Sequence, residues 1–104
     1  MERLGIVWTG RALADLERIG EFISADDPEA AARWIGRLIG TVERAALVPS
    51  AGRRVPEVRR DDIREHLLRT YRVVYRMLPS AIEVLTLFEG HRRFPDDLDL
   101  DGTD

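Results

Sequence analysis

The segment from Ile63 to Pro95 constrains the fold of this chain more than any other part of the sequence. It contains three runs rich in β-branched, aromatic and apolar residues, at about 63–68, 71–78 and 82–89, separated by very short breaks. Residues of this kind favour extended strands, and very short breaks between strands favour antiparallel hairpins. The sequence therefore predicts a three-stranded antiparallel meander.

The Pro and Ser at 79–80 set the expected register of the last two strands. If they form a two-residue turn, Arg76 lies opposite Glu83 and Tyr71 lies opposite Phe88, and both are favourable cross-strand pairs. A three-residue turn would move the opposing residues to the other face of the sheet, so the register stays open at this point.

Arginine and histidine residues are set into this meander and follow it. In the register of the two-residue turn, Arg72, Glu89 and His91 share one face, because side chains two residues apart point the same way. The segment ends with Arg92 and Arg93. A guanidinium is always charged and can bind a phosphate or carboxylate with two hydrogen bonds, so these positions suit anion recognition. For Arg72, structural ion pairs with acids of the sheet are the alternative.

The N-terminal half predicts a short strand and two helices. Residues 5–8 form an apolar run typical of a strand. One helix is predicted from an N-cap at Thr9 to about residue 24, and a second from an N-cap at Asp27 to about residue 47, with apolar residues at helical spacing in both. The short break between them favours an antiparallel helical hairpin. Residues 53–62 are predicted to form a loop.

These elements predict a two-layer α+β domain, in which an N-terminal strand joins the edge of the sheet and the helical hairpin covers one face. The 104 residues suffice for a single domain, which we assign to residues 1–95. Residues 96–104 hold five of the 19 acidic residues and no basic residue, and we expect them to form a flexible acidic tail.

Composition excludes several kinds of site. The chain has no cysteine, which excludes disulfides, thiolate metal sites and cysteine nucleophiles. All 16 basic residues are arginine, so lysine chemistry is also excluded. No apolar run reaches the roughly 20 residues of a membrane span, and the first residues lack the apolar stretch of a signal peptide. We therefore expect a cytoplasmic protein with no membrane partner, no metal and no cofactor.

In their order and spacing, several segments resemble the RelE/ParE superfamily of bacterial type II toxin–antitoxin toxins. The resemblance covers most of residues 6–95 and rests on VWTGRALADLERIGEFI, DDPEAAAR, GRRVPE, IREHLLRTYRVVYRM and the closing GHRR. It implies the two-layer RelE/ParE-like fold. It also implies a small cytoplasmic toxin, of the kind associated with plasmid stabilization, that is held inactive in a hetero-oligomer with the antitoxin encoded alongside it.

The superfamily divides by mechanism, which leaves the activity open between two targets. ParE-type members inhibit DNA gyrase, whereas RelE-type and YoeB-type members are endoribonucleases that cleave mRNA on the ribosome. By position, Arg72 and Arg92 match two arginines of the ribonucleases, and Glu57 with His91 resembles the acid/base pair of YoeB-type toxins. Cleavage beside a 2′-hydroxyl needs a base, an acid and positive charge, and these four residues are the candidate catalytic set.

Departures from the ribonuclease pattern favour the ParE-like interpretation. Two lysines of RelE-type toxins would fall near Ile63 and Glu65, and their C-terminal tyrosine would fall near Leu98. The sequence is therefore interpreted first as a gyrase inhibitor whose target-binding surface includes Arg92 and Arg93. Whether the protein is an enzyme depends on this choice. A toxin that has lost its activity and only binds the antitoxin is a third interpretation.

The last strand of the meander is apolar on both faces, with Leu85, Leu87 and Phe88 among its residues. A two-layer domain covers only one face of its sheet, and the family implies that an antitoxin segment fills a groove on the toxin. We therefore expect Leu85, Leu87, Phe88 and Arg76 to bind the antitoxin. A central strand that loops shield on its second face is the alternative.

Overall fold

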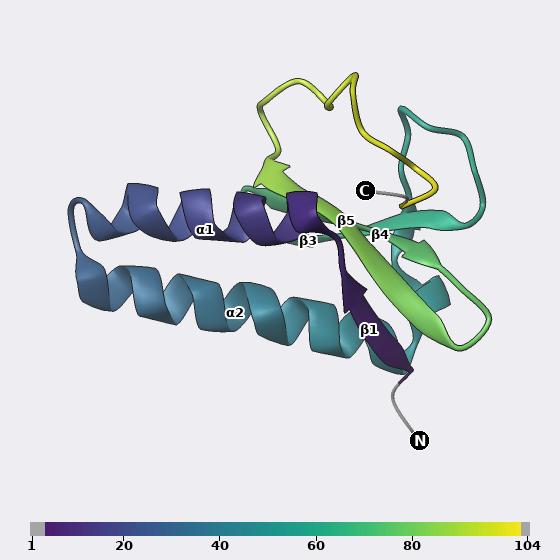
Figure 1. Ribbon diagram of the computed structural model, residues 1–104, viewed down its shortest axis with the longest axis horizontal. Coiled ribbons are helices and arrows are strands. Elements are labelled where there is room, and N and C mark those ends of the chain that lie inside the picture. The colour runs from purple at the N-terminus through teal and green to yellow at the C-terminus, as the bar shows by residue number, and fades with distance from the viewer. Residues whose placement is uncertain (1–3, 103–104) are drawn as a thin grey trace.

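The computed structural model describes residues 4–102, which form two helices and a five-stranded sheet (Figure 1). Strand β1 (Gly5–Trp8) leads into helices α1 (Gly10–Ser24) and α2 (Pro28–Leu47). The 3-10 turn η1 (Pro49–Ala51) and the short strand β2 (Arg53–Arg54) follow, and then the meander β3 (Ile63–Leu68), β4 (Tyr71–Met77) and β5 (Ala81–Glu89). The predicted α+β architecture is confirmed, with β2 as an element that the sequence analysis missed.

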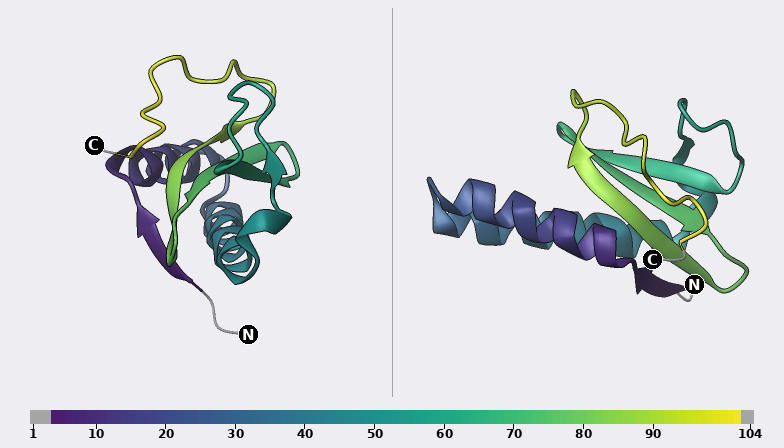
Figure 2. Two further views of the ribbon diagram at one scale, coloured as in Figure 1. Left: turned by 90° about the vertical axis from the view of Figure 1, so that its right-hand side faces the viewer. Right: turned by 45° about the horizontal axis from the view of Figure 1, so that its top comes forward.

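The sheet has the strand order β1-β5-β4-β3-β2. The two edge strands, β1 and β2, lie on opposite sides of the meander (Figure 2). Strand β1 pairs in parallel with β5, with Gly5 opposite Ala81 and Trp8 opposite Val84. This places the first strand at the edge of the sheet, as predicted. The pairs β2–β3, β3–β4 and β4–β5 are all antiparallel.

A β-bulge lies in the hairpin of β4 and β5. The pairing shifts by one residue between Val74 and Tyr75, and Leu85 is left without a partner in the register. On the turn side of the bulge, Arg76 lies opposite Glu83, as the sequence predicts. Such an extra residue bends the strand and increases its twist. The bulge therefore divides β5 into two parts with different registers.

Beyond the bulge the predicted register is wrong. Tyr71 lies opposite Glu89, and Arg72 lies opposite Phe88. Arg72 and Glu89 therefore lie on opposite faces of the sheet, although the sequence analysis placed them on one face. The physical reason is that one inserted residue exchanges the faces of all positions that follow it.

Side-chain caps fix both helices where the sequence predicts them. The Oγ1 of Thr9 accepts a hydrogen bond from the backbone N–H of Ala12 and donates one to the carbonyl of Val84, so it caps α1 and ties it to β5. Asp27 accepts bonds from the first backbone N–H groups of α2. Asp15 is buried on α1 and accepts bonds from the Thr86 hydroxyl and the Leu87 backbone N–H. These contacts fix α1 against β5.

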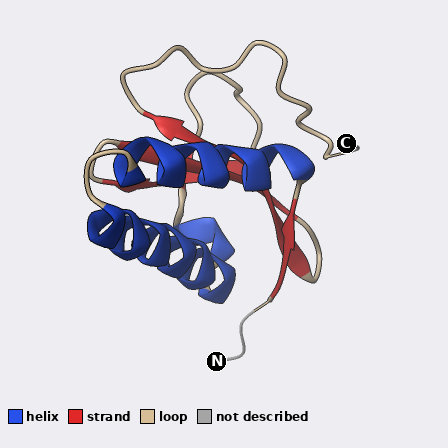
Figure 3. Cartoon of the chain, turned by 60° about the vertical axis from the view of Figure 1, so that its left-hand side comes forward, coloured by secondary structure: helices blue, strands red, loops and turns tan. Residues whose placement is uncertain are grey.

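The two helices lie antiparallel and cover one face of the sheet, which we call the inner face (Figure 3). Apolar side chains of both helices and of β4 and β5 form the main core between these layers, and its largest buried members are Leu38, Val42, Tyr75, Ile82 and Leu87. In residues 4–102, no helix is long and apolar enough to cross a membrane.

The opposite, outer face of the sheet is covered by two irregular segments, residues 55–62 and 94–102 (Figures 1 and 2). A second core lies there, with Val55, Ile63, Val74 and Leu85 buried and Val58, Phe88, Phe94, Leu98 and Leu100 packed against them. The expectation that this face is open is wrong, because loops shield it where no regular layer does. Strand β5 instead matches the alternative given above, a central strand whose second face is shielded by loops.

The predicted acidic tail is described as far as residue 102, and 103–104 lie outside the described residues. Its Leu98 and Leu100 pack on the outer-face core. Asp97 accepts a hydrogen bond from Arg11 at 2.9 Å, and Asp101 accepts one from Arg60 at 3.3 Å. Residues 94–102 are therefore in contact with the body of the domain. The expected flexibility of 96–104 stays a prediction.

Candidate functional site

Arg72 lies on the outer face of β4 and is only 7% exposed. Its Nε donates a hydrogen bond to Glu65 at 2.7 Å, and its two terminal nitrogens donate to the two oxygens of Glu57 at 2.8 Å each. The Phe88 and Phe94 rings lie 5.2 Å and 5.5 Å from the guanidinium carbon. All three guanidinium nitrogens of Arg72 thus bond to carboxylates of the same chain, and two aromatic rings lie near the guanidinium.

Glu65 continues this arrangement into an ion-pair network. Its side chain is buried, and its second oxygen accepts a 2.6 Å hydrogen bond from Arg53, which is half-exposed. We call the four residues Glu57, Arg72, Glu65 and Arg53 the outer-face network. Charges alternate along it, and a buried carboxylate is tolerated only when partners of this kind compensate its desolvation. Glu65 therefore depends on Arg72 and Arg53.

The network changes the acid–base properties of its members. The hydrogen bonds from Arg72 lower the pKa of Glu57, against the smaller raising effect of burial. The bonds to Glu57 in turn raise the pKa of Arg72, which is fully protonated in any case. A carboxylate that is bonded to a guanidinium is a weaker base than a free one. Glu57 is therefore held as an ion-pair partner, and proton abstraction by it is disfavoured.

The structure brings Glu57 and Arg72 together and leaves His91 and Arg92 apart from them. His91, Arg92 and Arg93 lie in the exposed loop after β5. The Nδ1 of His91 is 3.5 Å from a Glu89 oxygen, and among residues 4–102 no hydrogen bond or ion pair joins His91 or Arg92 to the outer-face network. The four predicted catalytic residues are thus not joined into one hydrogen-bonded set among residues 4–102.

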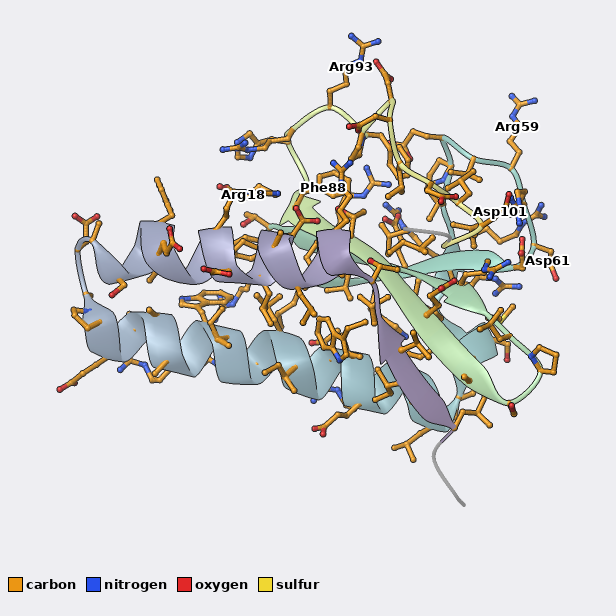
Figure 4. The ribbon with its side chains drawn as sticks, viewed as in Figure 1. Arg18, Arg59, Asp61, Phe88, Arg93 and Asp101 are labelled. Atoms are coloured by element: carbon orange, nitrogen blue, oxygen red, sulfur yellow. The ribbon has the colours of Figure 1, made fainter. Side chains whose placement is uncertain are left out.

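A cleft of about 680 Å³ lies between α1 and the C-terminal end of β5. Arginine side chains from both walls reach it, together with the exposed ring of Phe22, and its lining includes Arg11, Arg18, Ile19, Leu87, Phe88, Arg92 and Arg93. Figure 4 shows Arg18 on α1, Phe88 beneath the loop, and Arg93 projecting from its crest. The cleft combines an apolar floor with a charged rim, in which these four arginines stand beside four acidic residues, Asp15, Glu21, Glu89 and Asp97.

The structure divides the predicted antitoxin-binding residues between two places. Leu87 and Phe88 line the cleft. Leu85 is buried on the outer face in the core beneath residues 94–102, and Arg76 on the same side bonds to Glu83 at 3.1 Å. Arg76 also lies 4.0 Å from Asp101 of the C-terminal segment. Leu85 is therefore covered by the chain itself.

Sequence reasoning missed Arg11, Arg18 and Phe22 of the cleft, whereas the pairing of Arg72 with Glu65 is one of the ion pairs that it offered as the alternative. A usable signal existed for α1, because positions seven and eleven residues after Arg11 fall on the same helical face. Phe22 is 72% exposed at the end of this stripe, which makes it available to a partner. The burial of Glu65 had no comparable signal, since it depends on β2 and the loop that closes over it. Within the described part of the chain, no group of acidic and histidine side chains is arranged to hold a metal ion.

His66 is a partly buried titratable group on the inner side of β3. Its ring stacks on Tyr75 with 5.8 Å between centroids, and its Nε2 is buried without a hydrogen-bond partner among the described residues. Burial, and secondarily the positive charge of Arg44 on α2, lower the pKa of this imidazole. The neutral ring is therefore the form that the fold accommodates.

We predict that His66 makes the domain less stable in mild acid. Its pKa is lower in the folded than in the unfolded chain, so the unfolded chain binds the proton more readily and stability falls as pH drops below about 6.5. Tm should therefore be lower at about pH 5.5 than at about pH 7.5. In a His66→Phe variant, which keeps the stacked ring and cannot titrate, this difference should shrink. An unchanged difference would assign the effect to other groups.

Comparison with known proteins gives a consistent set of matches. The family described as the ParE toxin of the type II toxin–antitoxin system parDE matches residues 6–94. A protein of Sinorhizobium fredii (strain NBRC 101917 / NGR234), named "Putative toxin Y4kP", is 38% identical over 97 residues, which cover 91% of this chain and 97% of that protein.

Two solved structures share the fold. A chain of the chromosomal ParDE system from P. aeruginosa matches with a TM-score of 0.69 and 21% identity, over 84% of this chain and 96% of that chain. A chain of the toxin–antitoxin complex RelBE2 from Mycobacterium tuberculosis matches with a TM-score of 0.56 and 18% identity, over 85% and 99% respectively. These likenesses confirm the two-layer RelE/ParE-like fold that the sequence predicts.

Proposed function

This chain belongs to the ParE toxin family of type II toxin–antitoxin systems, and we propose on that basis that it inhibits DNA gyrase until a cognate antitoxin binds it. It would act in the cytoplasm, where gyrase and a co-expressed antitoxin are both present. The inhibited form would be a hetero-oligomer of toxin and antitoxin. No cofactor enters this proposal.

The observation that supports gyrase over mRNA as the target is the position of Arg72. A ribonuclease needs a cation aimed at the phosphate whose charge grows in the transition state. Arg72 instead donates to Glu57 and Glu65, and aromatic rings lie near its plane. The candidate general acid, His91, is 72% exposed in the loop after β5. The endoribonuclease alternative requires Glu57 and Arg72 to lie together, as they do, but their contact holds Glu57 as an ion-pair partner and makes it a weaker base.

We propose that Arg92 and Arg93 contact the target. Both are exposed, and the Arg93 side chain is 86% exposed at the crest of its loop (Figure 4). Arg93 lies 3.4 Å from Asp96, and this pair is too solvated to hold the arginine in place. Arginine is enriched among the residues that dominate binding at protein interfaces.

We propose the cleft as the principal docking site for the antitoxin. Its apolar floor, which includes Leu87 and Phe88, fits apolar side chains of an antitoxin segment, and the four arginines of its mixed-charge rim offer partners for acidic ones. A disordered segment that folds on binding can bury a large area of this kind despite its ordering cost. Leu85 would join the contact only where residues 94–102 are displaced, and Arg76 at the edge of that segment would gain access at the same time.

The experiment that tests the proposal compares two assays with the purified protein. We expect inhibition of DNA supercoiling by gyrase, no cleavage of ribosome-bound mRNA, and relief of inhibition by the antitoxin. The Arg92→Ala/Arg93→Ala variant should inhibit at least about 10-fold less strongly, because two exposed interface arginines are lost. Arg59→Ala removes an exposed arginine from another loop and serves as the matched control.

His91→Gln separates the two mechanisms. It should leave gyrase inhibition unchanged, whereas loss of a general acid typically costs a nuclease roughly 10²–10⁴ in rate. Cleavage of ribosome-bound mRNA that His91→Gln abolishes would overturn the gyrase proposal in favour of the ribonuclease. If the unmodified protein is inactive in both assays and expression does not slow growth, the inactive-toxin interpretation holds.

A further inference from the structure

The loop that carries Arg92 and Arg93 is fixed at its far end by an aromatic clamp. The ring of Phe94 meets the ring of Phe88 edge-on, with 5.8 Å between centroids and 85° between planes. The guanidinium carbon of Arg72 lies 5.2 Å from the Phe88 ring and 5.5 Å from the Phe94 ring. A guanidinium plane stacks favourably on aromatic rings, so the three side chains form one contact.

Further contacts fix the loop on either side of this clamp. At its start, the Gly90 N–H donates to the Thr70 carbonyl, and a Cβ at Gly90 would lie only 3.1 Å from that oxygen. Beyond the clamp, Asp97 accepts a 2.9 Å hydrogen bond from Arg11 on α1. Both ends of the loop are therefore attached to the body, and only its crest is exposed.

The outer-face network explains why Arg72 can serve as a clamp. Glu57 and Glu65 bind the edge of its guanidinium through all three nitrogens, which fixes the orientation of the plane. Since those bonds lie in the plane, the two faces stay available for stacking. Arg53 completes the network by bonding to Glu65. The orientation of Arg72 thus depends on a chain of residues that starts at β2.

We propose that Arg72 is a positioning residue: together with Phe88 it clamps Phe94, and through it holds the loop 91–95 in the one arrangement that presents Arg92 and Arg93 to the target. This inference rests on the proposed target contact of these two arginines. A loop that is already ordered loses less conformational freedom on binding, so the clamp increases affinity without touching the target. Arg72 then contributes to toxicity with no catalytic role.

The first test measures the loop without any target. Trypsin cleaves after arginine, and cleavage after Arg92 and Arg93 can be followed by mass spectrometry, with the exposed Arg59 as internal reference. Phe94→Ala removes the clamped ring and should accelerate cleavage at the two loop sites by about 10-fold or more, since opening becomes easier. Cleavage after Arg59 should stay unchanged. Phe94→Tyr keeps the ring and should behave like the unmodified chain.

The second test measures gyrase inhibition by the same variants. We expect Phe94→Ala to weaken inhibition by about 10-fold, and Phe94→Tyr to retain it. Arg72→Lys keeps a positive charge beside Glu57 and Glu65 but has no planar group to stack, so it should loosen the loop in the same way. It also gives a second route to the result if Phe94→Ala does not fold. Arg92→Ala/Arg93→Ala in the Phe94→Ala background should cause little further loss, because the clamp acts through these residues.

The outcomes separate this inference from the proposal on which it rests. Equal cleavage rates in the unmodified chain, Phe94→Ala and Arg72→Lys would overturn the clamp itself. A loosened loop with full gyrase inhibition would overturn the positioning role. If Arg92→Ala/Arg93→Ala leaves inhibition intact in the unmodified background, the target surface is wrong, and the proteolysis result still decides whether the clamp exists.

Discussion

Replacement of Arg72 by alanine is expected to lower the free energy of unfolding by about 3 kcal/mol, because removal of one partner leaves a buried charge uncompensated. Glu65 is 1% exposed and would keep only its bond to Arg53. Glu57 is accessible to water and should lose little. For a domain of this size, Tm should fall by roughly 12–24 °C, since 1 kcal/mol corresponds to about 4–8 °C. Thermal unfolding followed by circular dichroism measures this shift.

A double variant shows whether the loss arises from the unpaired carboxylate. Arg72→Met/Glu65→Met removes both charges and keeps similar volumes, and buried pairs replaced in this way are often neutral or even stabilised. It should therefore be more stable than Arg72→Ala, although it carries one more substitution. A Tm for Arg72→Ala within about 2 °C of the unmodified chain would show that Glu65 does not depend on Arg72. Loss of toxicity in Arg72→Ala alone reports lost structure as readily as lost catalysis.

Local signals predicted the elements that depend on local interactions. Thr9 and Asp27 cap helices because their side chains reach backbone N–H groups two or three residues away, and such spacings are visible in the sequence. The Arg76–Glu83 pair lies close to its turn and follows from it. The first strand, β1, followed from the apolar run near the start of the chain. These features needed no knowledge of tertiary contacts.

The bulge at Leu85 was not predictable in the same way, and it changed which residues of β5 lie opposite Arg72. β5 has no glycine at that point, and its apolar run reads equally well in either register. Beyond the end of β1, side chains of the helical layer bond to backbone groups of β5 on either side of the bulge. Thr9 donates to the Val84 carbonyl, and Asp15 accepts from the Leu87 N–H. Tertiary contacts therefore supply hydrogen bonds to β5 where its pairing with β1 ends. Because of this shift, Arg72 faces Phe88 and the outer-face network, and it lies away from Glu89.

The candidate site shows the same division. The exposure of Arg92 and Arg93 follows from their place after the last strand, and it could be predicted. The cleft requires α1 and the end of β5 to come together, and Glu65 becomes buried only when β2 pairs with β3. Arginine at position 72 had two interpretations in the sequence, anion binding and ion pairing. Its contacts in the structure are those of an ion pair, with Glu65 on the neighbouring strand β3 and Glu57 on the loop before it.

Removal of residues 96–104 is expected to destabilise the domain by about 2–4 kcal/mol. Two partly buried leucines, Leu98 and Leu100, leave the outer-face core, and burial of a leucine side chain contributes about 1.5–3 kcal/mol when it is complete. The buried side chains beneath them, including Leu85, would then face water. The exposed ion pairs of Asp97 and Asp101 should add little. We therefore expect a Tm lower by roughly 8–30 °C and a greater tendency to aggregate.

Point substitutions show whether apolar packing or charge attaches this segment. Leu98→Ser/Leu100→Ser should reproduce most of the loss, whereas Asp96→Asn, at an exposed position in the same segment, should leave Tm unchanged. Amide hydrogen exchange of Val74 and Leu85 should accelerate in the leucine variant alone, because water reaches their strands only when the cover is lost. A truncated chain as stable as the full one would mean that residues 96–104 move freely in solution, as their composition suggests. The outer face of β5 would then be open to an antitoxin segment without any displacement.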